Sequence, residues 1–236
     1  MNVFSNRDVI APTREELWGG FVCFMAYLLV IPAVLSLCFP IFAEDTPHSL
    51  FLYNLTISVC CFLLTLILFR KFLFRSRLPF GLLFVTCLFG FLANRALENL
   101  LWLLLSFLQQ FLKETPINLN QATVSAFLNT YRGAMLVNVV ILGPFVEEIL
   151  FRGVIFGPLC KKNIFLAYVA SMVAFAALHV ISYIGVQHWS VLLFSALQYL
   201  PAGFVLCWSY QRSQSIWAPI VLHGLMNLFV SLLSMS

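Results

Sequence analysis

Two adjacent glutamates stand in an otherwise apolar stretch, ILGPFVEEILFRG, at residues 141–153. Glu147 and Glu148 are followed by Arg152, and two later apolar stretches contain His179 and His223. Ionisable side chains are costly inside a membrane, and they mark a functional site by default. A single buried histidine is usually just a hydrogen-bonded core residue. Two carboxylates together with two imidazoles instead favour acid–base chemistry.

Helix periodicity predicts different roles for the two glutamates. Glu148 and Arg152 are four residues apart, so they share a helix face and can form an ion pair, which lowers the cost of burying either charge. Glu147 lies about 100° around the helix from Glu148 and has no obvious local partner. An unpaired carboxylate near an imidazole suits a general base that acts on water.

The last apolar stretch carries a second polar pair, His223 and Asn227, also four residues apart. An imidazole and an amide that point to one spot in a dry cavity can hold the oxyanion of a tetrahedral intermediate. Phe175 lies one helical turn before His179, where it either walls the site or packs in the core. Pro144 has no N–H, so we expect it to free the carbonyl of Val140 and to kink the helix just before the glutamates.

The composition indicates a membrane protein. The chain has 236 residues, of which 62% are hydrophobic and only 9% charged. That is too little polar surface for a soluble domain and too much hydrophobicity for a disordered chain. The net charge of +4 comes from 13 Lys and Arg scattered between apolar runs, so we expect no nucleic-acid partner. The predicted fold class is all-α, a polytopic transmembrane bundle of about seven helices, at about 20 residues per span, that encloses a membrane-embedded cavity.

The predicted organisation is one cytoplasmic N-terminal segment, residues 1–16, and a single transmembrane bundle, residues 17–236, with the catalytic core at about 130–232. The most polar interior stretch, 113–133, is expected to be an extramembrane loop with a short amphipathic helix. Arg95 and Glu98 are expected to pair on the long third span. The expected spans are 17–43, 50–69, 80–112, 134–156, 164–184, 190–209 and 214–234.

Charge asymmetry between the loops predicts the orientation. Lysines and arginines gather in the 70–79 loop, in the 157–163 loop and at Arg212, whereas the loop between the first two spans carries Glu44 and Asp45. The positive-inside rule then places the N-terminus and the basic loops in the cytoplasm and the C-terminus outside. The localisation expected is a multi-pass protein of the cell membrane.

The depth of each candidate residue can be counted from the expected ends of its span. At a rise of about 1.5 Å per residue, Glu147 and His223 fall about 13 Å from the cytoplasmic ends of their spans, and His179 about 22 Å. The count therefore predicts a site in the cytoplasmic half of the membrane, but it places His179 deeper than the other two residues.

Three motifs in this order resemble a known family. EExxxR at residues 147–152, FxxxH at 175–179 and HxxxN at 223–227 are similar to those of the CAAX-protease and bacteriocin-processing family of intramembrane endopeptidases, which includes type II CAAX prenyl endopeptidases and lysostaphin-resistance-like proteins. The resemblance covers roughly residues 130–232. It implies a helical bundle around a conical cavity that is open towards the cytosol, and cleavage of a peptide or a prenylated protein at the bilayer.

The resemblance also implies roles for individual residues. Glu147 and His179 would activate the attacking water, and His223 and Asn227 would stabilise the oxyanion. Glu148 and Arg152 would be a supporting pair. The first 130 residues carry no motif of this family.

The sequence allows two hypotheses about a metal ion in the site. Glu147, His179 and His223 form a possible carboxylate–His–His set that leaves one position free for water, as zinc hydrolases do. The HExxH pattern of zincins is absent, however. We expect no cofactor and keep zinc as the alternative.

Other functions compete with the endopeptidase. The sequence contains neither the GxSG nor the GxGD motif of serine and aspartyl intramembrane proteases. The main alternative is a non-catalytic membrane adaptor or bacteriocin-immunity protein that keeps the motifs for structure. A transporter with a carboxylate proton relay is disfavoured, because the two halves of the chain show no repeat symmetry.

Overall fold

The computed structural model describes residues 9–40, 46–76, 78–112 and 118–235. In these residues the structure is helical without strands, and seven helices are long and apolar enough to cross a membrane. The predicted all-α, multi-span fold is thereby confirmed. Glu44, Asp45 and Arg77, which entered the charge argument, lie outside the described residues. The seven spans are Arg14–Cys38, Pro47–Arg75, Phe80–Leu108, Arg132–Cys160, Ile164–Tyr183, Trp189–Ser213 and Trp217–Ser234.

The first span comprises α1 (Arg14–Met25), the π-helix η1 (Ala26–Val30) and α2 (Ile31–Cys38). It begins at Arg14, three residues before the predicted boundary, because Thr13 and Glu16 form a capping box that satisfies the first backbone N–H groups. The Glu16 carboxylate also accepts a hydrogen bond from Arg75, at 2.6 Å. The start of α1 is therefore part of the bundle.

The second and third spans are the long helices α3 (Pro47–Arg75) and α4 (Phe80–Leu112). Thr46 caps α3 and accepts a hydrogen bond from the backbone of Ser49. On α4, Arg95 and Glu98 form the expected ion pair, and Glu98 also accepts a hydrogen bond from Asn94 at 2.8 Å.

The fourth span carries the two glutamates and contains two π-helices. It runs through α6 (Arg132–Val137), η3 (Asn138–Leu142), α7 (Gly143–Glu148), η4 (Ile149–Phe156) and α8 (Gly157–Cys160). π-helical turns are frequent at functional sites, and here they lie on both sides of the short helix that ends in Glu147 and Glu148.

The wide turn of η3 changes which carbonyl Pro144 frees. The N–H of Gly143 bonds to the carbonyl of Asn138, five residues back. The next carbonyl in that register belongs to Val139, and its partner would be the N–H that Pro144 lacks. The prediction of a free Val140 carbonyl assumed α-helical spacing, whereas the π-helical register of η3 assigns this position to Val139.

The remaining helices complete the bundle. Within the polar segment expected to hold a short helix, α5 covers Leu119–Thr130, while residues 113–117 lie outside the described residues. The last three spans are α9 (Ile164–Val180) with η5 (Ile181–Tyr183), α10 (Trp189–Leu197) with α11 (Leu200–Ser213), and α12 (Trp217–Ser234).

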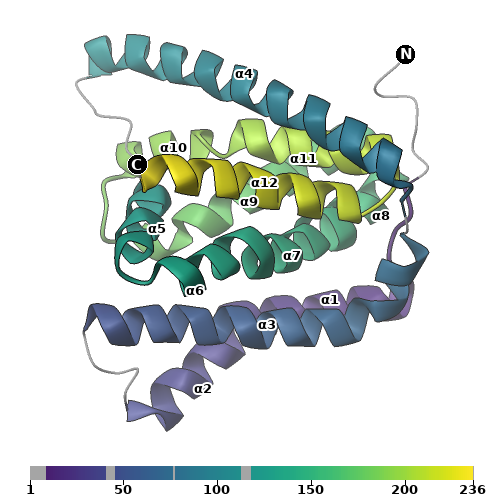
Figure 1. The fold of residues 1–236 in the computed structure, drawn as a ribbon, viewed down its shortest axis with the longest axis horizontal. Helices are drawn as coiled ribbons and strands as arrows, with labels where there is room; N and C mark the ends of the chain where they lie inside the picture. Colours follow the sequence, from purple (N-terminus) through teal and green to yellow (C-terminus); the bar gives the residue numbers. More distant parts are fainter. Residues whose placement is uncertain (1–8, 41–45, 77, 113–117, 236) are drawn as a thin grey trace.

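The helices of the second half form the centre of the molecule (Figure 1). α4 covers one side and α1 with α3 covers the other. α11 packs against α4, α9 and α12, so it is the central helix of the later bundle. Large apolar side chains such as Trp18, Leu37 and Phe80 are exposed on the outside, as expected of a surface that faces lipid.

Candidate active site

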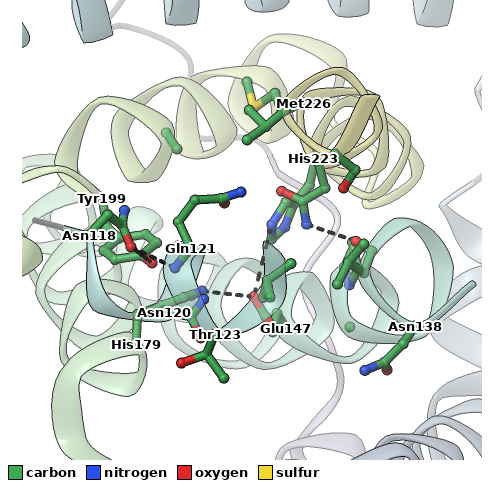
Figure 2. A pocket seen from close by; sticks show the side chains of 18 of the residues that line it. Asn118, Asn120, Gln121, Thr123, Asn138, Glu147, His179, Tyr199, His223 and Met226 are labelled. Carbon is green, nitrogen blue, oxygen red and sulfur yellow. Dashed lines mark hydrogen bonds and ion pairs between the residues drawn. The ribbon is translucent and has the colours of Figure 1, made fainter. Parts of the chain in front are cut away.

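A cavity of about 810 Å³ lies between the helices, and it brings together side chains that are far apart in the sequence. Its lining includes five of the predicted site residues, Glu147, Phe175, His179, His223 and Asn227. Figure 2 shows Glu147 on one wall, with His179 and His223 approaching it from two other helices. The predicted supporting pair, Glu148 and Arg152, is buried behind this wall.

Glu147 presents a carboxylate oxygen to both imidazoles. Its Oε2 lies 3.8 Å from Nε2 of His179 and 4.0 Å from Nε2 of His223. This oxygen is buried and has no hydrogen-bond partner among the described residues. Both oxygen–nitrogen distances are too long for a direct hydrogen bond, but a water molecule about 2.8 Å from the oxygen and from the nitrogen can bridge either pair.

The partners of the two rings indicate where their protons are. Nδ1 of His179 lies 2.8 Å from the carbonyl oxygen of Phe175, and Nδ1 of His223 lies 2.8 Å from Oε1 of Glu148. Carbonyl and carboxylate oxygens only accept hydrogen bonds, so Nδ1 carries the proton in both rings. Each neutral ring therefore turns a bare Nε2 towards Glu147. Three hydrogen-bond acceptors therefore face the same part of the cavity: Oε2 of Glu147 and Nε2 of each imidazole. A water molecule or an added proton supplies the hydrogen atoms for their hydrogen bonds.

Glu148 connects the two parts of the site. Its Oε1 accepts hydrogen bonds from Arg152 at 2.9 Å and from His223 at 2.8 Å, and both Glu148 and Arg152 are fully buried. Arg152 also donates to the carbonyl of Gly203 at 3.2 Å and lies 4.5 Å from the centre of the Phe175 ring. The expected Glu148–Arg152 pair is present. Its additional bond to His223 fixes the orientation of that ring.

Aromatic rings hold His179 in place. The ring of Phe175 lies at a centroid distance of 4.6 Å from that of His179, and the ring of Tyr199 stacks on it at 4.1 Å. The Tyr199 hydroxyl donates to the side chain of Asn118, the N-cap residue of α5, at 2.9 Å. Sequence reasoning did not single out Tyr199. The sequence feature that could have indicated Tyr199 is Pro201, in the first turn of α11. Proline favours the start of a new helix, so the span is interrupted there and the Tyr199 side chain turns inwards.

Asn227 has a structural partner that the sequence did not indicate. Its Nδ2 donates to the carbonyl of Val139 at 2.8 Å, the oxygen left free by Pro144. An amide nitrogen has two N–H groups, so this bond leaves one for the cavity. Asn227 therefore ties α12 to η3, and only its second N–H is left for an oxyanion.

α12 approaches the fourth span closely at Gly224. A Cβ atom built at Gly224 would lie only 2.5 Å from the carbonyl oxygen of Val140, a backbone atom that cannot move alone. The missing side chain thus lets His223 and Asn227 reach the helix that carries Glu147.

We expect Gly224→Ala to force these two helices apart. The variant should lose about 1–3 kcal/mol of stability, the usual cost of overpacking, and should lose activity because His223 moves with the helix. Thermal melting in detergent measures the first effect. Gly133→Ala is the matched control, because its added Cβ meets nothing within 4 Å. Equal melting temperatures for the two variants would contradict the close approach.

The cavity lies further from the basic loops than the sequence count indicated. The fourth span continues to Cys160, so about 20 Å of helix separates Glu147 from that end at a rise of about 1.5 Å per residue. Glu147 and His179 are then at matching depths. His223 is level with them, because its Nε2 lies 4.0 Å from the Glu147 carboxylate. The sequence count ended the fourth span at residue 156, four residues before the helix ends.

The three candidate metal ligands do not fit a zinc ion as they are placed. Zinc bonds of about 2.0–2.1 Å in a tetrahedron put neighbouring donors about 3.4 Å apart, whereas Glu147 lies 3.8 and 4.0 Å from the two imidazoles. In the described part of the chain, no group of three or more His, Cys, Asp or Glu side chains is arranged to hold a metal ion.

Comparison with known proteins agrees with this site. Residues 129–229 match the sequence model of the family described as "Type II CAAX prenyl endopeptidase Rce1-like". These residues are similar to the domain that this family model describes. The Rce1-like domain coincides with the 130–232 region of the predicted resemblance, which is thereby confirmed, and it contains all three motifs.

A curated relative also matches. "Putative membrane peptidase YdiL" of Bacillus subtilis (strain 168) is 38% identical over 96 residues, which are 40% of this chain and 35% of that protein. The match thus spans about a third of the relative's length. No solved structure matches the chain. The two matches together support a membrane peptidase.

Proposed function

We propose that this chain is an integral-membrane endopeptidase in which Glu147 deprotonates a water molecule that attacks a peptide carbonyl. One observation carries the proposal. The Glu147 carboxylate oxygen is buried at the cavity wall, has no partner among the described residues and faces the Nε2 atoms of two imidazoles. The family match and the motif order support the same chemistry.

The reaction is balanced by residues at this wall. Glu147 accepts one proton as the water oxygen bonds to the peptide carbon, with His179 holding the water. The carbonyl oxygen becomes an oxyanion. His223 takes up the added proton at Nε2 before the reaction, and it donates that N–H to the oxyanion together with the second N–H of Asn227. The C–N bond then breaks, and Glu147 returns its proton to the leaving nitrogen.

Glu148 supports this sequence without touching the substrate. Its carboxylate accepts the Nδ1–H of His223, so it stabilises the positive charge that His223 needs as an oxyanion donor. Arg152 holds Glu148 in position through the 2.9 Å ion pair. We assign both as positioning residues.

The proposed substrate is a peptide, or a prenylated protein as in the enzymes that give the family its name. The experiment that tests the function compares peptide termini in cells that express the wild-type chain or Glu147→Gln. We expect a set of new termini that only the wild-type chain produces. Identical sets of termini would contradict an endopeptidase and would favour the adaptor alternative.

We further propose that the reaction needs no metal. A purified sample should keep its rate of peptide cleavage after incubation with a strong chelator, because the water is held by Glu147 and the imidazoles. Elemental analysis of the same sample is the companion measurement. Loss of cleavage with the chelator, and its return on adding zinc, would contradict this mechanism and require the Glu147–His179–His223 set to close around a metal.

A further inference from the structure

The cavity occupies one end of the helical bundle. It is lined by the first half of α3, the second half of α4, α5, the end of α9 and the second half of α12. These elements meet at the end where α5 and the C-terminus lie in Figure 1. Hydrogen bonds join them there, from Gln121 to Ser234 and between Thr123 and Tyr183. We call this the cavity end.

The positive charge gathers at the opposite end, which we call the basic end. Contacts between the helix termini define it, because Trp217 donates to the carbonyl of Leu73 at 3.2 Å and Ser215 donates to the carbonyl of Ser76. Around these contacts lie the end of α3, the loop after α8 and the end of α11. Their basic residues are Arg70, Lys71, Arg75, Lys161, Lys162 and Arg212. At the cavity end the described helix termini and loops contribute Arg132 alone.

The two ends therefore differ in the property that sets membrane orientation. Lysine and arginine in short loops stay in the cytoplasm, while acidic residues such as Glu15 contribute little. The basic end is then cytoplasmic and the cavity end is not. The mouth of the cavity is rich in uncharged amides, which suits contact with water on that side. Six of them are Asn54, Asn99, Asn118, Asn120, Gln121 and Gln198.

We propose that the cavity opens to the non-cytoplasmic face of the membrane, so that Glu147 meets polypeptide segments exposed on that face. The opening follows from the cavity position and the charge distribution, and the substrate class rests in addition on the proposed function. A segment that has already crossed the membrane fits this placement, whereas a prenylated chain end that stays in the cytosol does not. The cytosolic opening that the family resemblance implies is thus not expected here.

Cysteine labelling tests the opening without any need for activity. Asn120→Cys at the cavity mouth and Lys162→Cys at the basic end are each made in a Cys38→Ser, Cys60→Ser background, since the other five cysteines are buried. Intact spheroplasts receive a membrane-impermeant maleimide, and permeabilised spheroplasts give the total. We expect Asn120→Cys to be labelled equally in both samples and Lys162→Cys only after permeabilisation. The reverse pattern, or equal access to both positions, would overturn the proposal.

A second measurement addresses the substrate side. A membrane-impermeant quenched peptide that the purified protein cleaves is added to right-side-out and to inside-out vesicles made from expressing cells. Cleavage should occur in the right-side-out vesicles and be absent with Glu147→Gln. Cleavage confined to inside-out vesicles would overturn the proposal. If the purified protein cleaves no peptide, the proposed function fails, and the labelling still decides on which side the cavity opens.

Discussion

Glu147→Gln should abolish most peptide cleavage while leaving the fold intact. A general base contributes about 10²–10⁴-fold to a rate, and the amide cannot take the proton from water, so kcat should fall by about that factor. The fold should survive because Gln has the same shape and the Glu147 oxygen it replaces has no hydrogen-bond partner among the described residues. Steady-state kinetics on purified protein measure the rate, and thermal melting in detergent measures the stability.

The matched control for this variant is Glu98→Gln. Glu98 also lines the cavity, but it is paired with Arg95 and accepts a hydrogen bond from Asn94. We expect it to affect kcat little. Equal losses of rate in the two variants would mean that any lost carboxylate in the cavity has the same effect, and the specific role of Glu147 would be contradicted.

Glu148→Gln should destabilise the protein strongly. The substitution leaves Arg152 as a fully buried charge without its anion, and removal of one partner of a buried pair costs about 3–5 kcal/mol. It also weakens the hold on His223, so cleavage should fall even where the variant still folds. The partly exposed Arg95–Glu98 pair gives the comparison, since breaking such a pair typically costs about 0–1 kcal/mol.

A double variant separates stability from activity. Replacing both members, as in Glu148→Leu with Arg152→Met, removes the unpaired charge, and such exchanges are often neutral or stabilising. We expect the melting temperature to recover relative to Glu148→Gln. Cleavage should stay low, because Nδ1 of His223 still has no carboxylate partner. Recovery of activity along with stability would show that Glu148 has only a structural role.

Features that depend on the spacing of residues along one helix could be predicted well from the sequence. The i,i+4 positions of Glu148 and Arg152 implied their ion pair, and the isolation of Glu147 on its helix face implied an unpaired carboxylate. The apolar runs predicted seven spans because each crossing needs about 20 apolar residues. The composition excluded a soluble domain before any motif was considered.

Contacts between helices could not be predicted in this way. The bond from His223 to Glu148 joins residues that are 75 positions apart, and nothing in either helix alone indicates it. The same holds for Tyr199 against His179. The partner of Asn227 depended on the π-helical register before Pro144, which moved the free carbonyl from Val140 to Val139.

The helix ends caused the other errors. The T-x-x-E pattern of Thr13–Glu16 is a capping box in the sequence, and it would have placed the start of the first helix correctly. The fourth span was predicted to end at residue 156, although the first charged residues after it, Lys161 and Lys162, come only after Cys160. Those four residues put Glu147 about 6 Å too close to the basic loops in the depth count.

A single-turnover reaction in ¹⁸O-labelled water tests directly whether Glu147 activates a water molecule. Purified wild-type protein in liposomes is mixed with a peptide that it cleaves, and mass spectrometry follows the new C-terminus. We expect one ¹⁸O atom in that carboxylate, formed without an accumulating covalent intermediate, and no product from Glu147→Gln on the same timescale. A peptide covalently attached to the protein, or product formed by Glu147→Gln at the wild-type rate, would contradict it.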